Sequence, residues 1–349
     1  MTSQMLTEIR QQPAALAATL SAVRSLHQEL RQLAQPTDRV ALFARGSSDT
    51  AATYGRYLLE IITGLPAALG APSVATLYHS PLDLSTTLAV MCSQSGQTAE
   101  LVEVADWARS RGARVVGVTN DASSPLARAV DVAVVTEAGA ETAVPATKSH
   151  TTCLLALAEL ALALTPVENA RRAPLLESMH EIPGEVSRLL DATDEVETAA
   201  GGLRGAKALC VTGRGFTYAT ALEVALKVEE TSAVPCLGLS QADLQHGPLA
   251  VLGVDTPVLV TAAADGPTLP GLTAVAAAAR ARGAPVVVLG GDDGLARQAD
   301  AVRAGPRLPE PLAPVALVVV GQLIAEALSR LLGGISDQPP GLTKVTQTS

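Results

Sequence analysis

Residues 88–108, LAVMCSQSGQTAELVEVADWA, combine a short apolar run, a polar turn and a stretch with helical spacing. The apolar run ends at Cys92, and hydroxyl and amide side chains surround one glycine in the next six residues. A strand that leads through a turn into a helix is the repeating unit of parallel α/β sheets. The stretch therefore predicts an α/β fold, and its polar turn indicates a binding site for a ligand.

The same alternation runs through the whole chain and restarts after a polar, proline-containing stretch at 166–183. In the first half we expect strands at 40–44, 87–92, 114–119 and 130–136, with helices at 50–62, 99–110 and 148–164. In the second half we expect strands at 208–213, 257–262 and 285–289, with helices at 220–231, 272–282 and 314–332. Strands alternating with helices predict parallel sheets covered by helices on both faces.

The two halves also match residue by residue. FARGSSDTAATYGRYLLE (43–60) aligns with residues 212–229, which end in ALEVALKVE, at a shift of 169 positions that places Arg45 on Arg214 and Glu60 on Glu229. Such internal similarity indicates a duplicated unit. The sequence thus predicts an N-terminal helical segment, two similar domains and a C-terminal tail, with boundaries at 1–35, 36–183, 184–335 and 336–349.

Composition narrows the class of protein. The 349 residues carry a net charge of −9, which argues against a nucleic-acid partner, because phosphate backbones are bound by clustered Lys and Arg. The N-terminus lacks the apolar core of a signal peptide. The apolar run 315–332 is interrupted by Gln322 and Glu326, which favours a buried core helix over a membrane span.

The four cysteines are scattered among apolar neighbours without metal-site spacing, at Cys92, Cys153, Cys210 and Cys236. This pattern favours small buried side chains over a disulfide or a metal site. A reducing compartment fits it, so we expect a cytoplasmic protein that contacts neither membrane nor nucleic acid.

The turn at 93–98 has the chemistry of an anion site. Backbone N–H groups and the positive end of a helix dipole meet there, and Ser93, Ser95 and Thr98 add hydroxyl donors. The turn RGSSDT (45–50) offers Ser47 and Ser48 at the end of the preceding strand, and adjacent strand ends converge in doubly wound sheets. The set suits a single phosphate monoester.

Two observations bear on that interpretation. Under the same shift the second half has AAADGP (262–267), without hydroxyls, which favours a ligand-binding role for the first copy; an ordinary Ser/Gly turn remains the alternative. Neither a P-loop nor a GxGxxG motif is present, which argues against a nucleotide.

A charged face stands out in the second half. Glu223, Lys227 and Glu230 lie at i, i+4 and i+7 in an otherwise apolar helix, so they share one face. Buried charges need partners, and the pattern fits a structural ion network as well as an active site. His246, in the turn-forming DLQHGPLA, and Lys344, in the Pro/Gly-rich tail, have ordinary structural and solvated alternatives.

SQSGQTAE resembles the SQSGET turn of the sugar isomerase (SIS) domain family. MLTEIRQQP, AETAVPATKSHTT, ALEVALKVEETS, LQHGPLA and PPGLTKVT extend the resemblance, from about residue 5 to 349, to the isomerase half of the glutamine–fructose-6-phosphate aminotransferases. It implies two tandem SIS domains, each a flavodoxin-like αβα sandwich with a parallel sheet, in a homodimer. It also implies a sugar 6-phosphate bound by Ser47, Ser48, Ser93, Gln94, Ser95, Thr98 and Val144.

The resemblance assigns catalytic roles as well. Glu230 matches the carboxylate that moves a proton between C1 and C2 of the open-chain sugar, with Lys227 and Glu223 as the supporting pair. His246 matches the ring-opening histidine, which reaches across from the other subunit. Lys344 matches the tail lysine that forms a Schiff base with the ketose, and the tail closes the active site. No metal or other cofactor is implied.

The match has limits at its edges. The chain begins Met1-Thr2-Ser3 where the synthase has its glutaminase cysteine, so we expect no release of ammonia from glutamine. Asp243, Gln245 and Thr343 replace Glu, Lys and Ala of the synthase. We therefore expect an amino-sugar-phosphate deaminase/isomerase that converts glucosamine 6-phosphate to fructose 6-phosphate and ammonia. The alternatives are an aldose–ketose isomerase, a fructosamine-phosphate deglycase and a non-catalytic sugar-phosphate sensor.

Overall fold

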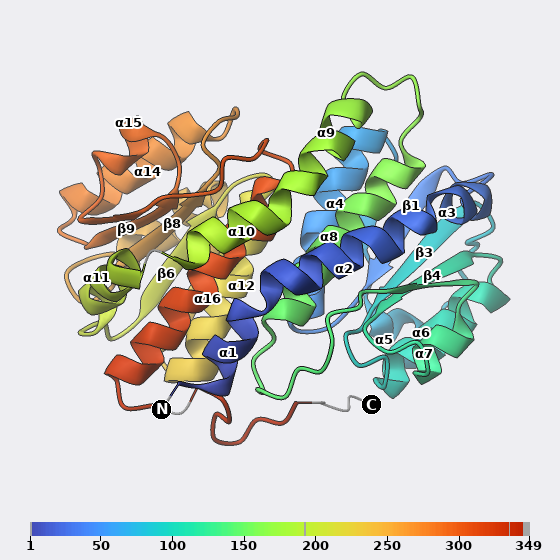
Figure 1. Cartoon of the computed structure of the whole chain (residues 1–349), viewed down its shortest axis with the longest axis horizontal. Coiled ribbons are helices and arrows are strands. Elements are labelled where there is room, and N and C mark those ends of the chain that lie inside the picture. The colour runs from blue at the N-terminus through green and yellow to red at the C-terminus, as the bar shows by residue number, and fades with distance from the viewer. Residues whose placement is uncertain (1, 192, 335, 345–349) are drawn as a thin grey trace. The chain divides into compact units, whose positions relative to one another are not determined.

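The structure of the chain is a computed structural model that describes residues 2–191, 193–334 and 336–344. Its contacts divide the chain into two compact units (Figure 1). The first-sheet unit comprises Ala14–Glu141 and Lys148–His180. The described residues of the second-sheet unit lie in the ranges 2–13, 142–147 and 181–344, so the unit takes in two short segments from the first half of the sequence. The boundaries expected from sequence remain predictions.

The first-sheet unit contains five parallel strands in the order β2-β1-β3-β4-β5. This is the flavodoxin-like order, with a switch point between β1 and β3. The strands are β1 (Arg39–Phe43), β2 (Ala67–Leu69), β3 (Thr87–Cys92), β4 (Arg114–Thr119) and β5 (Val132–Val135). The helices are α2 (Gln12–Ser25), α3 (His27–Leu33), α4 (Ser47–Leu58, continued by a π turn over Leu59–Thr63), α5 (Pro72–Thr76), α6 (Ala99–Ser110), α7 (Pro125–Ala129), α8 (Lys148–Leu164) and α9 (Arg172–Ser178).

The second-sheet unit repeats this topology. Its parallel strands lie in the order β10-β9-β8-β6-β7, which is again 2-1-3-4-5 when they are counted from β6. They are β6 (Leu209–Gly213), β7 (Cys236–Ser240), β8 (Val258–Ala262), β9 (Val286–Gly290) and β10 (Ala301–Arg303). The helices are α1 (Gln4–Arg10), α10 (Ile182–Leu190), α11 (Thr193–Leu203), α12 (Thr217–Ser232), α13 (Gln241–Gln245), α14 (Leu269–Ala281), α15 (Asp293–Ala296) and α16 (Ala313–Leu331). The α/β fold class expected from sequence, with parallel sheets of flavodoxin-like order, is therefore confirmed.

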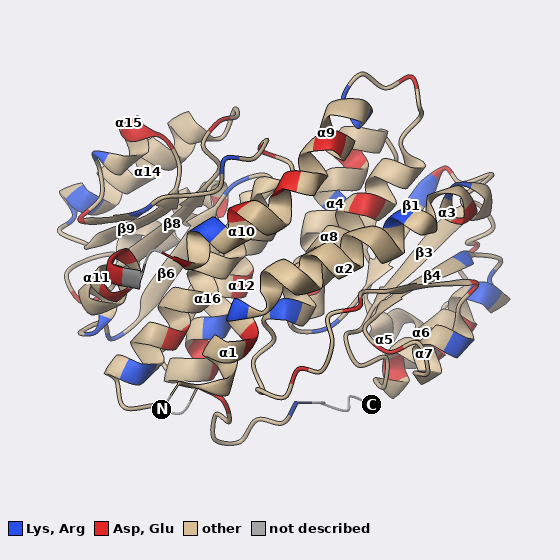
Figure 2. Cartoon of the chain, in the orientation of Figure 1, with Lys and Arg blue, Asp and Glu red and all other residues tan. Residues whose placement is uncertain are grey.

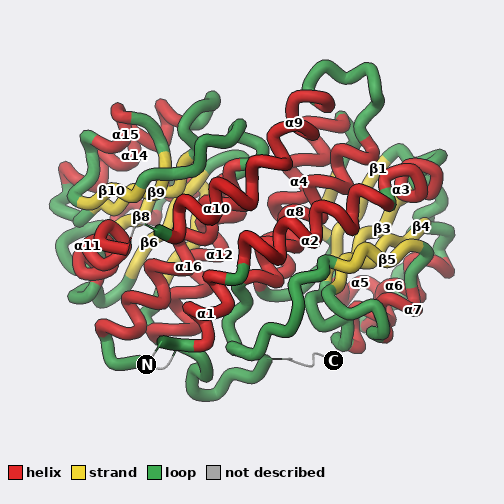
Figure 3. Tube along the Cα trace, viewed as in Figure 1, coloured by secondary structure: helices red, strands yellow, loops and turns green. Residues whose placement is uncertain are grey.

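Each sheet lies between layers of helices (Figure 3). Both faces of a parallel sheet are covered, so the central strands are continuous apolar runs rather than alternating ones. Every residue of β3, β8 and β9 is buried. In the first-sheet unit α4 packs on α8, and in the second-sheet unit α12 packs on α16.

Helix α16 is the core helix of the second-sheet unit. Among the described residues it is the one helix long and apolar enough to cross a membrane by length and composition, but 83% of its apolar window is buried inside the fold. Residues 313–329 are all buried, including Gln322 and Glu326. The apolar surface of this helix is thus used for packing within the unit.

The sequence patterns missed the sheet edges and one helical stretch. Strands β2 and β10 have only three residues each, and β7 begins directly after a proline, so none has a strong apolar pattern. The polar stretch 166–183 is not an irregular connection, because it contains α9, a 3-10 turn (Met179–Glu181) and the start of α10. Its buried residues Leu175, Met179 and Ile182 follow the i, i+4, i+7 spacing of an amphipathic helix, so the sequence did carry a helical signal there.

Candidate active site

Two polar turns lie at the carboxyl edge of the first sheet, at its switch point. The turn after β1 leads into α4, which begins with Ser47 and Ser48. The turn after the neighbouring strand β3 contains residues 93–98 and leads into α6. Ligands of open α/β sheets bind at such switch points. The structure therefore brings the two predicted phosphate-binding turns to one edge of one sheet.

The turn at 93–98 is braced by its own hydroxyl oxygens. Ser93 Oγ accepts a hydrogen bond from the N–H of Gly96 at 3.2 Å, and Ser95 Oγ accepts one from the N–H of Gln97 at 3.2 Å. The backbone carbonyl of Gln94 accepts from the N–H of Asn120 at 2.9 Å. A hydroxyl that accepts a hydrogen bond keeps its own proton to donate, so both serines can still serve an anion.

Gly96 is required at its position for two reasons. Its φ is +60°, a left-handed conformation that side chains disfavour. A Cβ there would lie 2.2 Å from Ser124 Oγ and 2.9 Å from Thr119 Oγ1. The glycine thus lets the backbone of the turn pack directly against two hydroxyl side chains.

The helices that follow the two turns begin without a side-chain cap. Gly46, at the N-cap of α4, and Thr98, at the N-cap of α6, make no capping hydrogen bond with a side chain. At the start of α4 the N–H groups of Ser48 and Asp49 donate to the backbone carbonyls of Arg45 and Gly46, at 3.2 and 2.9 Å. What each helix start offers an anion is therefore the positive end of its dipole. Both helices have 12 residues, so each has a developed dipole.

An ion pair that the sequence did not reveal joins the two turns. Arg45, in the first turn, donates from Nε and Nη2 to the two oxygens of Glu100 on α6, at 3.0 and 2.8 Å. Glu100 is 6% exposed, and its hydrogen bonds raise the pKa of the Arg45 guanidinium. Such a bidentate pair fixes geometry as well as charge. Arg45 is therefore held by α6 as a brace between the turns.

The predicted acid–base residues form a compact cluster on α12 in the second-sheet unit. Lys227 Nζ lies 3.4 Å from Glu223 Oε1 and also contacts Glu230 Oε2. Lys227 and Glu223 are fully buried, whereas the side chain of Glu230 is 21% exposed. The three residues therefore share one helix face as predicted, and Glu230 is the member that solvent reaches.

Burial is the main cause of the pKa shift at Glu230. It raises the pKa of this carboxyl, although the ammonium of Lys227 pulls the pKa back down. At Lys227 burial lowers the pKa, and the two carboxylates outweigh it and raise the pKa overall. Lys227 thus stays a cation between two carboxylates, and Glu230 becomes a carboxylate that binds a proton more readily than usual.

The remaining predicted residues of this unit are placed as follows. Lys344 is half-buried, and its charge lowers the pKa of Glu230. Val144 is half-buried, and its N–H donates to the carbonyl of Asp337 at 2.9 Å. His246 is exposed at the C-terminus of α13. In the part of the chain that the structure describes, no hydrogen bond or ion pair joins the side chain of His246 to the α12 cluster.

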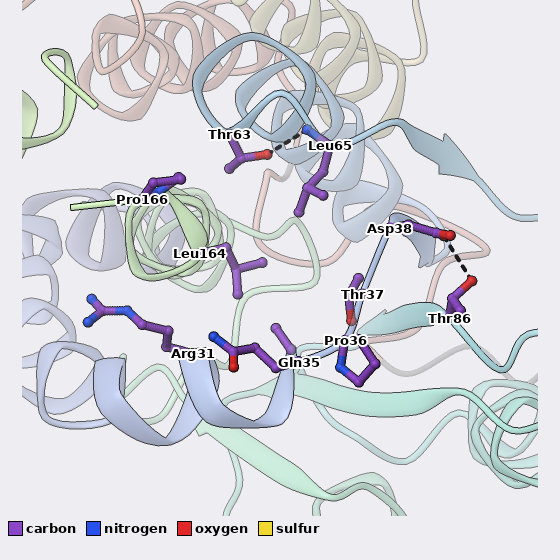
Figure 4. Close-up of a pocket in the computed structure, with 11 residues that line it drawn as sticks. Arg31, Gln35, Pro36, Thr37, Asp38, Thr63, Leu65, Thr86, Leu164 and Pro166 are labelled. Carbon is purple, nitrogen blue, oxygen red and sulfur yellow. Dashed lines mark hydrogen bonds between the residues drawn. The ribbon is translucent and has the colours of Figure 1, made fainter. Parts of the chain in front are cut away.

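Cavities and the distribution of charge give little further information about the two polar turns and the α12 cluster. A cavity of about 380 Å³ lies at the amino edge of the first sheet, below β1 and β3, and none of the candidate residues lines it (Figure 4). A second, of about 410 Å³, lies beside Arg45 and Gly46 at the carboxyl edge. Acidic and basic positions are interspersed over the ribbons of both units (Figure 2). The described residues hold no group of three or more His, Cys, Asp or Glu arranged for a metal ion.

Comparison with known proteins identifies the family. The chain is 33% identical over 340 residues to glutamine–fructose-6-phosphate aminotransferase of Pyrococcus horikoshii and 35% identical over 363 residues to that of Symbiobacterium thermophilum. The alignments cover 97% of this chain but only 57% and 58% of those proteins, so the chain spans little more than half their length.

A solved structure extends the comparison to the fold. The C-terminal domain of glucosamine-fructose-6-phosphate aminotransferase from Francisella tularensis superimposes with a TM-score of 0.90 at 25% identity. The superposition covers 97% of this chain and 99% of that domain. The family model for the SIS domain matches residues 32–163 and again 202–328, one segment for each sheet. The chain therefore belongs to the SIS domain family.

Proposed function

We propose that the protein is an amino-sugar-phosphate deaminase/isomerase that converts glucosamine 6-phosphate and water to fructose 6-phosphate and ammonia. The observation that carries the proposal is the α12 cluster, in which a buried Lys227 holds a partly exposed Glu230 whose pKa is raised by burial. A carboxylate with a raised pKa exchanges protons well near neutrality. The relatives named above are aminotransferases acting on fructose 6-phosphate, which supports a phosphosugar substrate.

The proposed reaction needs one group to move a proton between two neighbouring carbons. Glu230 removes the proton from C2 of the open-chain aldehyde while the aldehyde oxygen takes a proton from water, which gives an enolamine. Glu230 then returns its proton to C1 and the nitrogen releases one to water, which gives the C2 imine. Water then adds to the imine and ammonia leaves. Lys227 stabilises the ionised form of Glu230 before the first transfer, because it lies within contact of that carboxylate.

The other predicted residues complete the proposal. Ser47, Ser48 and the turn at 93–98 bind the phosphate through hydroxyls and helix-end amides. Lys344, whose charge acts on Glu230, forms a Schiff base with the ketose product. Val144 contacts the sugar. His246 opens the hexose ring in the neighbouring subunit of a homodimer.

We also propose a cytoplasmic location. The four cysteines are all free and buried, which suits a reducing compartment. The reaction as written requires no metal or other cofactor.

Ammonia release from glucosamine 6-phosphate tests the proposal directly. Glu230→Gln should abolish turnover and leave binding of the phosphosugar nearly unchanged. Full activity in this variant would exclude the role given to Glu230. Interconversion of an aldose and a ketose phosphate without ammonia release would favour the isomerase alternative, and release of an amino acid from a fructosyl-amino-acid phosphate would favour the deglycase. Binding without turnover of any of these would favour a sensor.

Subunit sharing has its own test. Inactive His246→Ala chains are mixed with inactive Glu230→Gln chains under conditions that exchange subunits. Sites shared across a homodimer would regain about one quarter of the activity after random exchange of equal amounts, because half of the dimers are mixed and each mixed dimer has one site with a wild-type His246 and a wild-type Glu230. No recovery would place both residues of one site on the same chain.

A further inference from the structure

Helix α1 carries a fully buried carboxylate that no part of the proposed mechanism uses. Glu8 Oε1 accepts hydrogen bonds from the N–H of Thr142 at 2.6 Å and from its hydroxyl at 3.1 Å. The N–H of Ala143 lies 3.3 Å from Oε2, and Gln4 Nε2 donates to Oε1 at 3.0 Å. The described ion pairs include none with Glu8. This carboxylate is thus satisfied by donors of the segment 142–147, which contains Val144.

A second carboxylate connects the same elements from the C-terminal side. Asp337 accepts from the N–H groups of Gln4 and Met5, at 2.9 and 2.8 Å, and so caps the start of α1. Its backbone carbonyl accepts from the N–H of Val144 at 2.9 Å. Asp337 therefore touches both α1 and the 142–147 segment, and it stands seven residues before Lys344.

Further polar links tie these elements to α16, which contacts α1 in the core of the unit. Ser3 Oγ donates to Glu326 Oε1 at 2.8 Å. Gln12 Nε2 donates to Gln322 Oε1 at 2.9 Å, and Gln322 Nε2 in turn donates to the carbonyl of Thr147 at 3.3 Å. In Figure 1, α1 lies beside α16 and α12. The anchor of the network is therefore the buried core helix.

We infer that Glu8 and Asp337 are paired positioning residues, which clip the segment carrying Val144 and the tail carrying Lys344 onto helix α1. The clip holds Lys344 close enough to Glu230 for its positive charge to lower the pKa of that carboxyl. The inference rests on the proposed function for the role of Lys344, but the clip itself rests on the hydrogen bonds above.

Carboxylates suit this role better than neutral groups. A carboxylate is a pure acceptor with about four lone-pair sites. The Glu8 carboxylate accepts hydrogen bonds from two backbone N–H groups, one hydroxyl and one side-chain amide. A glutamine there has one acceptor oxygen, and its NH2 group would face a donor. Glu8→Gln thus removes acceptors without changing side-chain shape, and a buried donor without a partner is costly.

Backbone hydrogen exchange tests the clip without reference to any reaction. In Glu8→Gln, exchange at the amides of Thr142 and Ala143 should rise about tenfold or more over wild type. In Asp337→Asn, the rise should appear at Gln4 and Met5. The matched control is Asp255→Asn, which removes a carboxylate of the same unit whose ion pair, among the described residues, is with exposed Lys207. Exchange at all four amides should stay at the wild-type rate. Wild-type exchange in both clip variants would overturn the inference.

Kinetics and trapping test the positioning role. Both variants should lower kcat for glucosamine 6-phosphate about tenfold and leave KM within about twofold, because the phosphate turns belong to the other unit. Reductive trapping with fructose 6-phosphate and cyanoborohydride should label Lys344 in wild type and several-fold less in the variants. Asp337→Glu, which keeps the charge, should regain part of the lost rate.

The outcomes separate the two proposals. If wild type neither releases ammonia nor traps fructose 6-phosphate, the proposed function fails and the exchange rates alone decide the clip. If wild type is active and the variants exchange faster but keep full kcat, the positioning role is wrong. Should Glu8→Gln fail to fold, Asp337→Asn carries the test, because Asp337 is only half-buried.

Discussion

Helices α4 and α12 are the same element of a duplicated fold, yet they carry opposite chemistry. Each follows the first strand of its sheet and packs on the long buried helix of its unit. At the shift of 169 positions the charged residues of α12 fall on apolar or aromatic residues of α4 and of the π turn that continues it, so that Glu223, Lys227 and Glu230 correspond to Tyr54, Leu58 and Ile61. Tyr54 and Leu58 are buried, so this position of the fold needs no charge for stability.

The turns that follow β3 and β8 also differ, and here the first copy carries the polar side chains proposed to bind a ligand. In the first sheet, Gly96 packs against the hydroxyls of Ser124 and Thr119. In the second sheet, a Cβ on Gly266 would meet the carboxyl carbon of Glu310 at 2.5 Å, and burial raises the pKa of the Glu310 carboxyl, with Asp265 adding to the effect. One turn offers donors to an anion, whereas the other already has carboxylates beside it. The comparison shows that the two copies carry different side chains on equivalent elements, which is what the proposed division between anion binding in one copy and proton transfer in the other requires.

The largest expected effect comes from removing the buried cation. Lys227→Met leaves Glu223 and Glu230 without their shared partner, and breaking a buried pair this way costs about 3–5 kcal/mol. The matched control is Leu58→Met on α4, a volume-conserving change that should cost less than about 1.5 kcal/mol. Urea unfolding of both variants measures the difference. Equal losses would mean that the charge on α12 is not buried as the structure has it.

The second effect concerns the glycines of the two turns. Gly96→Ala forces a Cβ against Ser124 in a strained backbone, so it should destabilise by about 1–3 kcal/mol and weaken binding of inorganic phosphate about tenfold. Gly266→Ala meets Glu310 and is strained as well, with φ +109°. It should destabilise similarly without changing phosphate affinity, as calorimetry can show. If both variants lost phosphate binding equally, the turns would not differ in role.

A smaller effect tests the hydroxyls alone. Ser95→Ala removes a donor to the anion and the acceptor for the N–H of Gln97, so phosphosugar affinity should fall about three- to tenfold, or about 0.5–1.5 kcal/mol. Ala264→Ser places a hydroxyl at the corresponding position of the second turn and should leave affinity unchanged. Titration calorimetry of the two variants measures their affinity for the phosphosugar. A gain of a second phosphate site in Ala264→Ser would contradict the assignment of anion binding to one copy.

The smallest effect is a pH dependence of stability. Because the folded-state pKa of Glu230 is raised, the group stabilises the fold while it is protonated, and this contribution is lost as pH rises through the folded pKa. Glu230→Gln, which mimics the protonated form, should therefore melt about 2 °C above wild type at pH 8 and together with wild type at pH 4. A variant that melted lower at pH 8 would show that the pairing with Lys227 dominates.

Sequence patterns predicted the centre of each sheet better than its edges. Long apolar strands and helices such as β3, α6 and α8 were predicted with the bounds that the structure has, because a buried parallel strand and a buried helix both leave a dense apolar signal. The three-residue edge strands lack that signal. Spacing also predicted that the α12 charges share a face, since that depends on local geometry alone.

Contacts between residues far apart in the chain could not be predicted from sequence patterns. Arg45 and Glu100 are 55 positions apart, and Glu8 and Thr142 are 134 apart. Nothing local marks such pairs, because their meeting depends on how the connecting segments fold. The roles of the phosphate-binding and catalytic residues stay predictions until the experiments above are made.

The braced turn at 93–98 has a consequence for how quickly a ligand is captured. Ser93 and Ser95 already hold the loop backbone, and Gly96 is locked against its neighbours. A preorganised loop loses little conformational entropy when an anion arrives. Association should therefore proceed in a single concentration-dependent phase in stopped-flow experiments, without a slow ordering step.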